Sequence, residues 1–210
     1  MVISIQKPKK IRNTKPKLSQ EAMLKALVYE EIDGRPLYYK GYRDVLISKK
    51  NQEDIMGAST IQWILVSYFM EFMILSLDKK KYRFATGEAG LHIGHRSNFA
   101  NDIAIFEKSV LTPQKINTRY ADVAPKIVVE IDIKIDLELP EDKDYVNLKT
   151  QKLLDFGVQT VFWIFTASQK IMVAHQNQDW TISTWYKDIE LLDGQFFNIG
   201  QYLDSEGIVL

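Results

Sequence analysis

The sequence predicts a mixed α/β (α+β) fold, in which helices flank a mixed central β-sheet. Helix-like and strand-like segments succeed one another along the chain, and residues 126–136 alternate in the regular manner of a β-strand. The composition, with 46% hydrophobic and 26% charged residues, is that of a soluble globular protein. At 210 residues the chain is long enough for one domain with a substantial core.

The first third of this domain is expected to be largely helical. Ser19 suits the N-cap of a helix over residues 20–29, and turn residues follow it before a short strand at residues 37–40. A long apolar helix is expected near residues 55–76, with Glu71 as its only charge. Its polar residues favour a helix of the core over one that crosses a membrane.

The remainder is expected to be mainly strands. Residues 126–136 place isoleucines and Val129 on one face and mostly charged side chains on the other. A helix over residues 143–156 follows, with Gly157 as its stop. Further strands are expected at residues 82–86, 90–93, 102–106, 158–165, 170–175 and 181–185, and residues 198–203 are expected to close the domain.

Charge divides the chain into an arm and a body, although Lys+Arg and Asp+Glu both number 27. Six basic and no acidic residues lie in the first 19 positions, so the body carries a net charge of −6. We therefore assign residues 1–18 to a basic N-terminal arm and residues 19–210 to the domain, and such an arm can attract phosphate. The six are Lys7, Lys9, Lys10, Arg12, Lys15 and Lys17.

Two absences limit the chemistry and the location. The chain has no cysteine, which excludes disulfides, zinc–thiolate sites and a catalytic thiol. Its start has no basic region followed by an apolar stretch, so no secretory signal is recognised. Together these features predict a cytoplasmic protein without a membrane partner.

A group of acidic residues provides the candidate chemistry. Glu130 and Asp132 are expected to project from the same face of one strand, and Asp102 begins another apolar strand. Buried acids are costly unless they are paired or bind a metal. With a lysine they would form a metal-assisted hydrolase site. The alternative is an exposed acidic face paired with Lys126 and Lys134.

Four segments, in this order and spacing, resemble the Uma-two family of proposed bacterial restriction endonucleases, which belongs to the PD-(D/E)XK nuclease superfamily. The likeness extends over residues 21–203. The four segments are Tyr29-Glu30-Glu31-Ile32-Asp33-Gly34, Asn101-Asp102-Ile103-Ala104-Ile105, Pro125-Lys126-Ile127-Val128-Val129-Glu130-Ile131, and Lys149 followed by Gly157-Val158 and the aromatic pair Phe162-Trp163.

The resemblance implies a restriction-endonuclease-like core and a metal site. Asp102 and Glu130 would bind Mg²⁺ or Mn²⁺, helped by the backbone carbonyl of Ile131. Asp132 stands where the superfamily lysine usually follows the glutamate, so Lys149 from the following helix would take that lysine's role. Asp132 would then be a further metal ligand.

Other features of the resemblance leave alternatives open. Glu30, expected on the first helix, would be an accessory acid of the catalytic site. Lys152 and Lys134 compete with Lys149 for the role of the lysine, and Asn101 replaces the motif proline.

The implied function is metal-dependent hydrolysis of DNA phosphodiester bonds by a homodimer. The alternative is a catalytically degenerate nuclease fold that binds nucleic acid or a protein partner.

Overall fold

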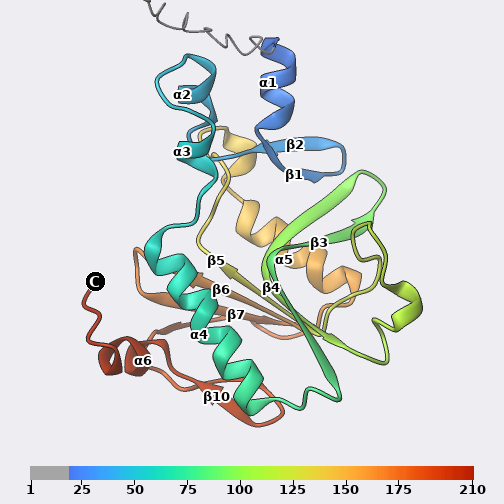
Figure 1. The fold of residues 1–210 in the computed structure, drawn as a ribbon, viewed down its shortest axis with the longest axis vertical. Helices are drawn as coiled ribbons and strands as arrows, with labels where there is room; N and C mark the ends of the chain where they lie inside the picture. Colours follow the sequence, from blue (N-terminus) through green and yellow to red (C-terminus); the bar gives the residue numbers. More distant parts are fainter. Residues whose placement is uncertain (1–18) are drawn as a thin grey trace, which may run out of the picture.

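The central sheet of the structure has eight strands, and helices cover both of its faces (Figure 1). The structure, a computed structural model, describes residues 19–210, so the predicted basic arm at residues 1–18 lies outside the described residues. The helices are α1 (Gln20–Ala26), α2 (Tyr42–Leu46), α3 (Glu53–Met56), α4 (Thr60–Ser76), α5 (Tyr145–Phe156) and α6 (Ile199–Ser205). The strands are β1 (Val28–Ile32), β2 (Arg35–Tyr38), β3 (Tyr82–Gly94), β4 (Ser97–Glu107), β5 (Ile127–Ile131), β6 (Thr160–Phe165), β7 (Lys170–His175), β8 (Thr181–Thr184), β9 (Ile189–Leu192) and β10 (Gln195–Phe197).

The strand order confirms the predicted mixed sheet. It runs β2-β1-β4-β5-β6-β7-β8, with β3 paired to β4, and β9 and β10 form a separate two-stranded sheet. Strands β5 and β6 are parallel, whereas the other neighbouring pairs are antiparallel. Helix α5 connects the parallel pair, as a crossover requires.

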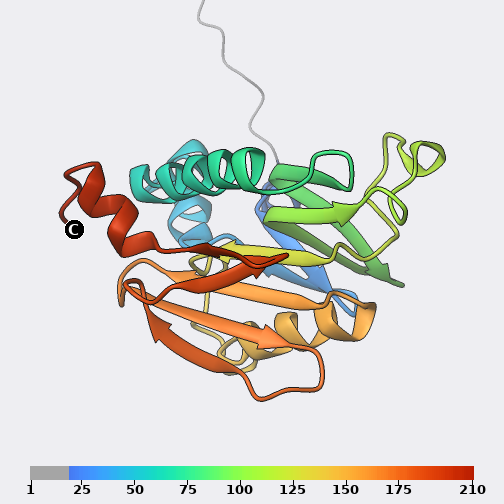
Figure 2. The same ribbon diagram turned by 90° about the horizontal axis from the view of Figure 1, so that it is seen from below.

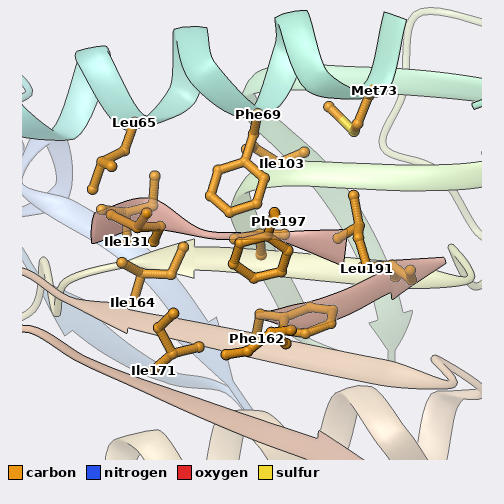
Figure 3. Packing of buried hydrophobic residues seen from close by; sticks show 14 of the residues in the cluster. Leu65, Phe69, Met73, Ile103, Ile131, Phe162, Ile164, Ile171, Leu191 and Phe197 are labelled. Carbon is orange, nitrogen blue, oxygen red and sulfur yellow. The ribbon is translucent and has the colours of Figure 1, made fainter. Parts of the chain in front are cut away.

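Helices α4 and α5 lie on opposite faces of the sheet (Figure 2). Helix α4 begins at Ser59, whose hydroxyl accepts a hydrogen bond from the amide of Gln62. Its residues Leu65, Phe69 and Met73 point onto the sheet, where they meet apolar side chains of β4, β5 and β6 (Figure 3). Burial of each such side chain contributes about 1.5–3 kcal/mol to the free energy of folding. Helix α5 ends at Gly157, whose φ of +113° confirms the predicted stop.

Strand β4 organises the sheet because its length allows two strands to pair along one of its edges. Strand β3 occupies the whole of the other edge. On the shared edge, Asn98 pairs with Glu31 of β1, and Ile103 pairs with Val129 of β5. Asp102 therefore lies where pairing of β4 with β1 gives way to pairing with β5, in the interior of the sheet and beside the end of β5.

The strand predicted at residues 126–136 ends five residues early, at Ile131. Asp132 has a φ of +59°, which interrupts the extended backbone and the alternation of faces. Ile127, Val129 and Ile131 consequently pack in the core cluster beneath α4. Beyond Asp132 the isoleucines change sides: Ile133 and Ile135 pack in the cluster on the α5 face. The prediction was wrong here because alternation alone does not reveal a left-handed residue.

Other segment boundaries also differ from the sequence prediction. The first helix ends at Ala26, so Glu30 lies on strand β1 and not on a helix. The strands predicted at residues 82–86 and 90–93 are one strand, β3, with an irregular register at Gly87 and Glu88. The C-terminal residues 199–205 form a helix, preceded by the β9–β10 pair that the sequence did not predict.

No helix within residues 19–210 combines the length and the apolar character that crossing a membrane requires. The apolar segment at residues 55–76 is divided between α3 and the 17-residue α4, and α4 packs on the sheet.

Candidate active site

The candidate site collects charged side chains from three adjacent strands and helix α5 beneath the sheet. Glu30 of β1, Asp102 of β4 and Glu130 of β5 are at most 5% exposed, and Lys149 of α5 is fully buried. The antiparallel register that pairs Ile103 with Val129 places Asp102 opposite Glu130, on the same face. The structure thus brings together four of the residues that the sequence singled out.

Lys149 is the positive centre of this group. Its Nζ donates hydrogen bonds to Oε1 of Glu30 at 2.6 Å and to the carbonyl of Ala100 at 3.1 Å. It also lies 3.0 Å from Oε1 of Glu130. Burial alone lowers the pKa of Lys149, but the charges of Glu130 and Glu30 outweigh burial, so the pKa is raised. The lysine is therefore a protonated counter-ion for two glutamates.

Glu30 is held by several donors. Besides Lys149, the backbone amide of Ala100 donates to its Oε1 at 3.0 Å. The hydroxyl of Tyr145 donates to its Oε2 at 2.6 Å. Ala100 lies between the parts of β4 that pair with β1 and β5, so the carboxylate supplies a partner to a strand amide that would otherwise lack one. Glu30 is therefore fixed in position by the fold.

Glu130 is the least satisfied member of the group. Its Oε1 is buried and accepts no well-directed hydrogen bond within residues 19–210, although Lys149 lies close to it. Burial, together with the charges of Asp102 and Glu30, raises the pKa of Glu130 to about 8, and Lys149 offsets part of that rise. An additional cation beside this carboxylate would offset both the cost of burying its negative charge and the repulsion from Asp102 and Glu30.

Asp102 extends from the sheet toward the end of β5. Its Oδ2 accepts a hydrogen bond from the backbone amide of Ile131 at 2.8 Å. Its Oδ1 accepts a hydrogen bond from Nζ of Lys134 at 2.6 Å. The carbonyl of Ile131, expected to assist metal binding, accepts a hydrogen bond from Nε2 of Gln62 at 3.1 Å. Gln62 of α4 therefore braces the backbone beside Asp102, a contact that no motif in the sequence predicted.

Asp132, the expected further metal ligand, makes a different set of contacts. Its Oδ1 accepts a hydrogen bond from the amide of Thr166 at 2.7 Å, and its Oδ2 accepts one from the Thr166 hydroxyl at 2.6 Å. These bonds join the end of β5 to the turn after β6. The structure thus engages both oxygens of Asp132 in holding that turn.

Lys152, one of the alternatives to Lys149, lies away from the group. Its Nζ pairs with the exposed carboxylate of Asp33 at 2.9 Å. Lys134, the other alternative, contacts Asp102 directly. The structure therefore leaves two lysines at the candidate site, one on each side of the carboxylates.

A groove of about 1390 Å³ gives solvent access to one side of the site. Asp102, Asp132 and Lys134 line it, together with residues of α2, α3 and the start of α4. Trp63 of α4 also lines the groove and is 53% exposed. Glu30, Glu130 and Lys149 lie beneath this surface and do not line the groove.

The donor set suits a hard divalent cation. Two carboxylates lie opposite each other on paired strands, and one of them has a buried oxygen that accepts no well-directed hydrogen bond, although Lys149 lies 3.0 Å from it. Within residues 19–210 no cluster of three or more His, Asp or Glu side chains is arranged around a common metal position. Mg²⁺ is commonly held by one or two carboxylates and completes its shell with water and phosphate oxygens, so two protein ligands suffice.

The arrangement of sheet and helices is an α+β fold with a mixed central sheet. The sequence matches no protein-family model, and no curated protein matches it. Among solved structures, a proposed nuclease of the DUF820 family from Anabaena variabilis resembles the chain with a TM-score of 0.59. The alignment covers 90% of this chain and 98% of that chain at 15% sequence identity. At this identity the likeness establishes a shared fold.

Proposed function

We propose that the protein is a nuclease of the PD-(D/E)XK superfamily, of the Uma-two type, and that it hydrolyses DNA phosphodiester bonds with a divalent cation. The observation that carries the proposal is the pair Asp102 and Glu130, opposed on neighbouring strands, with a buried oxygen of Glu130 that accepts no well-directed hydrogen bond and has the ammonium of Lys149 on one side. The shared fold with a proposed nuclease supports the same conclusion.

In this proposal Asp102 and Glu130 are the residues that hold Mg²⁺ or Mn²⁺. The cation, when bound, would polarise a phosphate oxygen and lower the pKa of a coordinated water. In the overall hydrolysis, the oxygen of one water would bond to phosphorus as one bridging P–O bond breaks; the water would release a proton to solvent, and the departing oxygen would take up a proton from solvent. The homodimer and the choice between the two cations remain predictions.

The buried residues prepare the site without meeting the substrate. Lys149 lies on the side of Glu130 that faces α5 and balances its charge within the core, and Glu30 holds Lys149 in position. Gln62 and the amide of Ile131 fix the backbone and the carboxylate at the end of β5. Preorganised groups of this kind avoid rearrangement during the reaction.

Cleavage of DNA by matched variants tests the proposal. Supercoiled plasmid and single-stranded DNA would be incubated with Mn²⁺ or Mg²⁺ and with wild type, Asp102→Asn or the control Asp179→Asn. Asp179 is an exposed aspartate remote from the site, so its variant should cleave like wild type. We expect Asp102→Asn and added EDTA to abolish cleavage. Equal cleavage by wild type and Asp102→Asn would refute the assignment.

One observation favours a second candidate function, a catalytically degenerate fold that binds nucleic acid or a protein. Both oxygens of Asp102 already accept hydrogen bonds from protein donors, so the site is also stable without a metal. A binding protein of this kind would shift labelled DNA in a gel with wild type and Asp102→Asn equally, and would cleave it with neither. Replacing the six basic residues of the first 18 positions would then weaken the shift.

A further inference from the structure

The two lysines of the site differ in what their ammonium groups can reach. Lys149 is fully buried, and its ammonium has two hydrogen bonds and one ion-pair contact with the protein. An ammonium group has three N–H donors, so Lys149 has none left for a substrate. Helix α5 also holds it beneath the carboxylates and away from the groove. Lys149 therefore acts as a counter-ion.

Lys134 lies on the other side of Asp102 and lines the groove. Its Nζ donates to Oδ1 of Asp102 at 2.6 Å, and its next carboxylate neighbour, Glu88, is 3.8 Å away. The side chain is 19% exposed. Because only one short contact is made, the ammonium group retains donors that can point toward a molecule in the groove.

The backbone around Lys134 is built to present it there. The φ of +59° at Asp132 turns the chain after β5, and the two hydrogen bonds to Thr166 hold this turn. The carbonyl of Lys134 accepts a hydrogen bond from the amide of Lys40 at 2.8 Å. The superfamily lysine is expected at position 132. The turn thus brings a lysine that lies two residues later, Lys134, to Asp102.

We propose that Lys134 is the lysine that contacts the substrate: its ammonium group donates a hydrogen bond to a non-bridging oxygen of the phosphate that is hydrolysed. This inference rests on the proposed nuclease function. The four-carbon side chain can move from Asp102 to a phosphate in the groove, which also frees an oxygen of Asp102. Lys134 keeps its protons throughout and stabilises the negative charge that grows on the phosphate oxygens.

The test uses Lys134→Ala with Lys40→Ala as its matched control. Lys40 is an exposed lysine that lines the same groove and forms no ion pair within residues 19–210. Plasmid cleavage at saturating Mn²⁺ should fall about 100-fold in Lys134→Ala, the size of effect seen when one stabilising donor is removed. Lys40→Ala keeps the backbone amide that bonds to Lys134, so its rate of cleavage should stay within about threefold of wild type, a change much smaller than the loss of a stabilising donor.

Two further readouts separate a substrate contact from a structural role. Added propylamine should restore part of the activity of Lys134→Ala, because the groove admits a small amine to the vacated position. The affinity for Mn²⁺, measured by calorimetry, should be equal to or higher than that of wild type, since Asp102 loses a competing cation.

The outcomes are distinguishable. Cleavage by Lys134→Ala at the wild-type rate would overturn the inference and leave the nuclease function standing. A parallel loss of cleavage and of Mn²⁺ affinity would also overturn it, because Lys134 would then support the metal site. Wild-type cleavage no greater than that of Asp102→Asn would overturn the nuclease function itself, and the role of Lys134 with it.

Discussion

Nζ of Lys149 lies 2.6 Å from Oε1 of Glu30, and both side chains are completely buried. The pair joins helix α5 to strand β1 across a face of the sheet that is otherwise largely apolar. Glu130 adds a second buried carboxylate to the same ammonium. Charges are costly to bury unless they are paired, so the stability of this region depends on Lys149.

Lys149→Met should therefore destabilise the protein strongly. The variant leaves Glu30 and Glu130 without their cation, and breaking a buried pair in this way costs about 3–5 kcal/mol. Urea unfolding followed by circular dichroism measures the change. Lys152→Met, one helical turn away, is the control: its ion pair with Asp33 is exposed, and its loss should have little effect. Similar stability of the two variants would contradict the account.

Stability without metal should depend on pH through Glu130. Its pKa is raised from 4.5 in the unfolded chain to about 8 in the folded protein. Between these values the folded state holds a proton that the unfolded state has released, so stability falls as the pH rises. In thermal unfolding measured in EDTA, the melting temperature of Glu130→Gln should rise relative to that of wild type as the pH increases from 5.5 to 8. Parallel pH profiles of the two proteins would refute this assignment.

The turn held by Asp132 can be tested separately from metal binding. Asp132→Ala removes two hydrogen bonds to Thr166 and puts alanine at a φ of +59°. We expect a loss of about 2–4 kcal/mol in unfolding free energy, because hydrogen bonds to charged groups contribute about 1.5–3 kcal/mol. Asp132→Asn keeps an acceptor and tolerates positive φ, so it should lose much less. Equal losses would show that the turn does not depend on these bonds.

Trp63 provides a prediction about substrate binding that depends on the nuclease function. Its half-exposed indole lines the groove, where an unpaired base could stack on it. Trp63→Ala should raise KM for single-stranded DNA about tenfold, since stacking on one base contributes about 1–3 kcal/mol. The value of kcat and the melting temperature should change little. Phe196→Ala, which removes an exposed aromatic outside the groove, should leave KM unchanged.

Local patterns in the sequence were sufficient for much of the fold. Strand β7 was predicted with its observed bounds, and the stop of α5 at Gly157 was read from a single residue. Both features depend on short-range preferences, namely alternation of side chains and the left-handed conformation that glycine adopts easily. The predicted core helix was found as α4, although its start was placed five residues early.

The errors arose where tertiary contacts override local preference. Asp132 continued a perfect alternation, but in the structure its bonds to Thr166 stabilise a left-handed turn. The sequence predicts Glu30 on the first helix, whereas pairing with Arg35–Tyr38 and with β4 makes this segment a strand. Gln62 and Tyr145 carry no motif, so their contacts with Ile131 and Glu30 could be found only in three dimensions.

The central claim is that Asp102 and Glu130 together hold a divalent cation, and calorimetric titration with Mn²⁺ tests it most directly. The titration is best made at pH 8.5, above the pKa of Glu130, so that most Glu130 carboxyl groups are ionised and protons compete less for the site. The account predicts one Mn²⁺ site per chain in wild type and its loss in both Asp102→Asn and Glu130→Gln. Equal binding by all three proteins, or none by wild type at millimolar Mn²⁺, would contradict it.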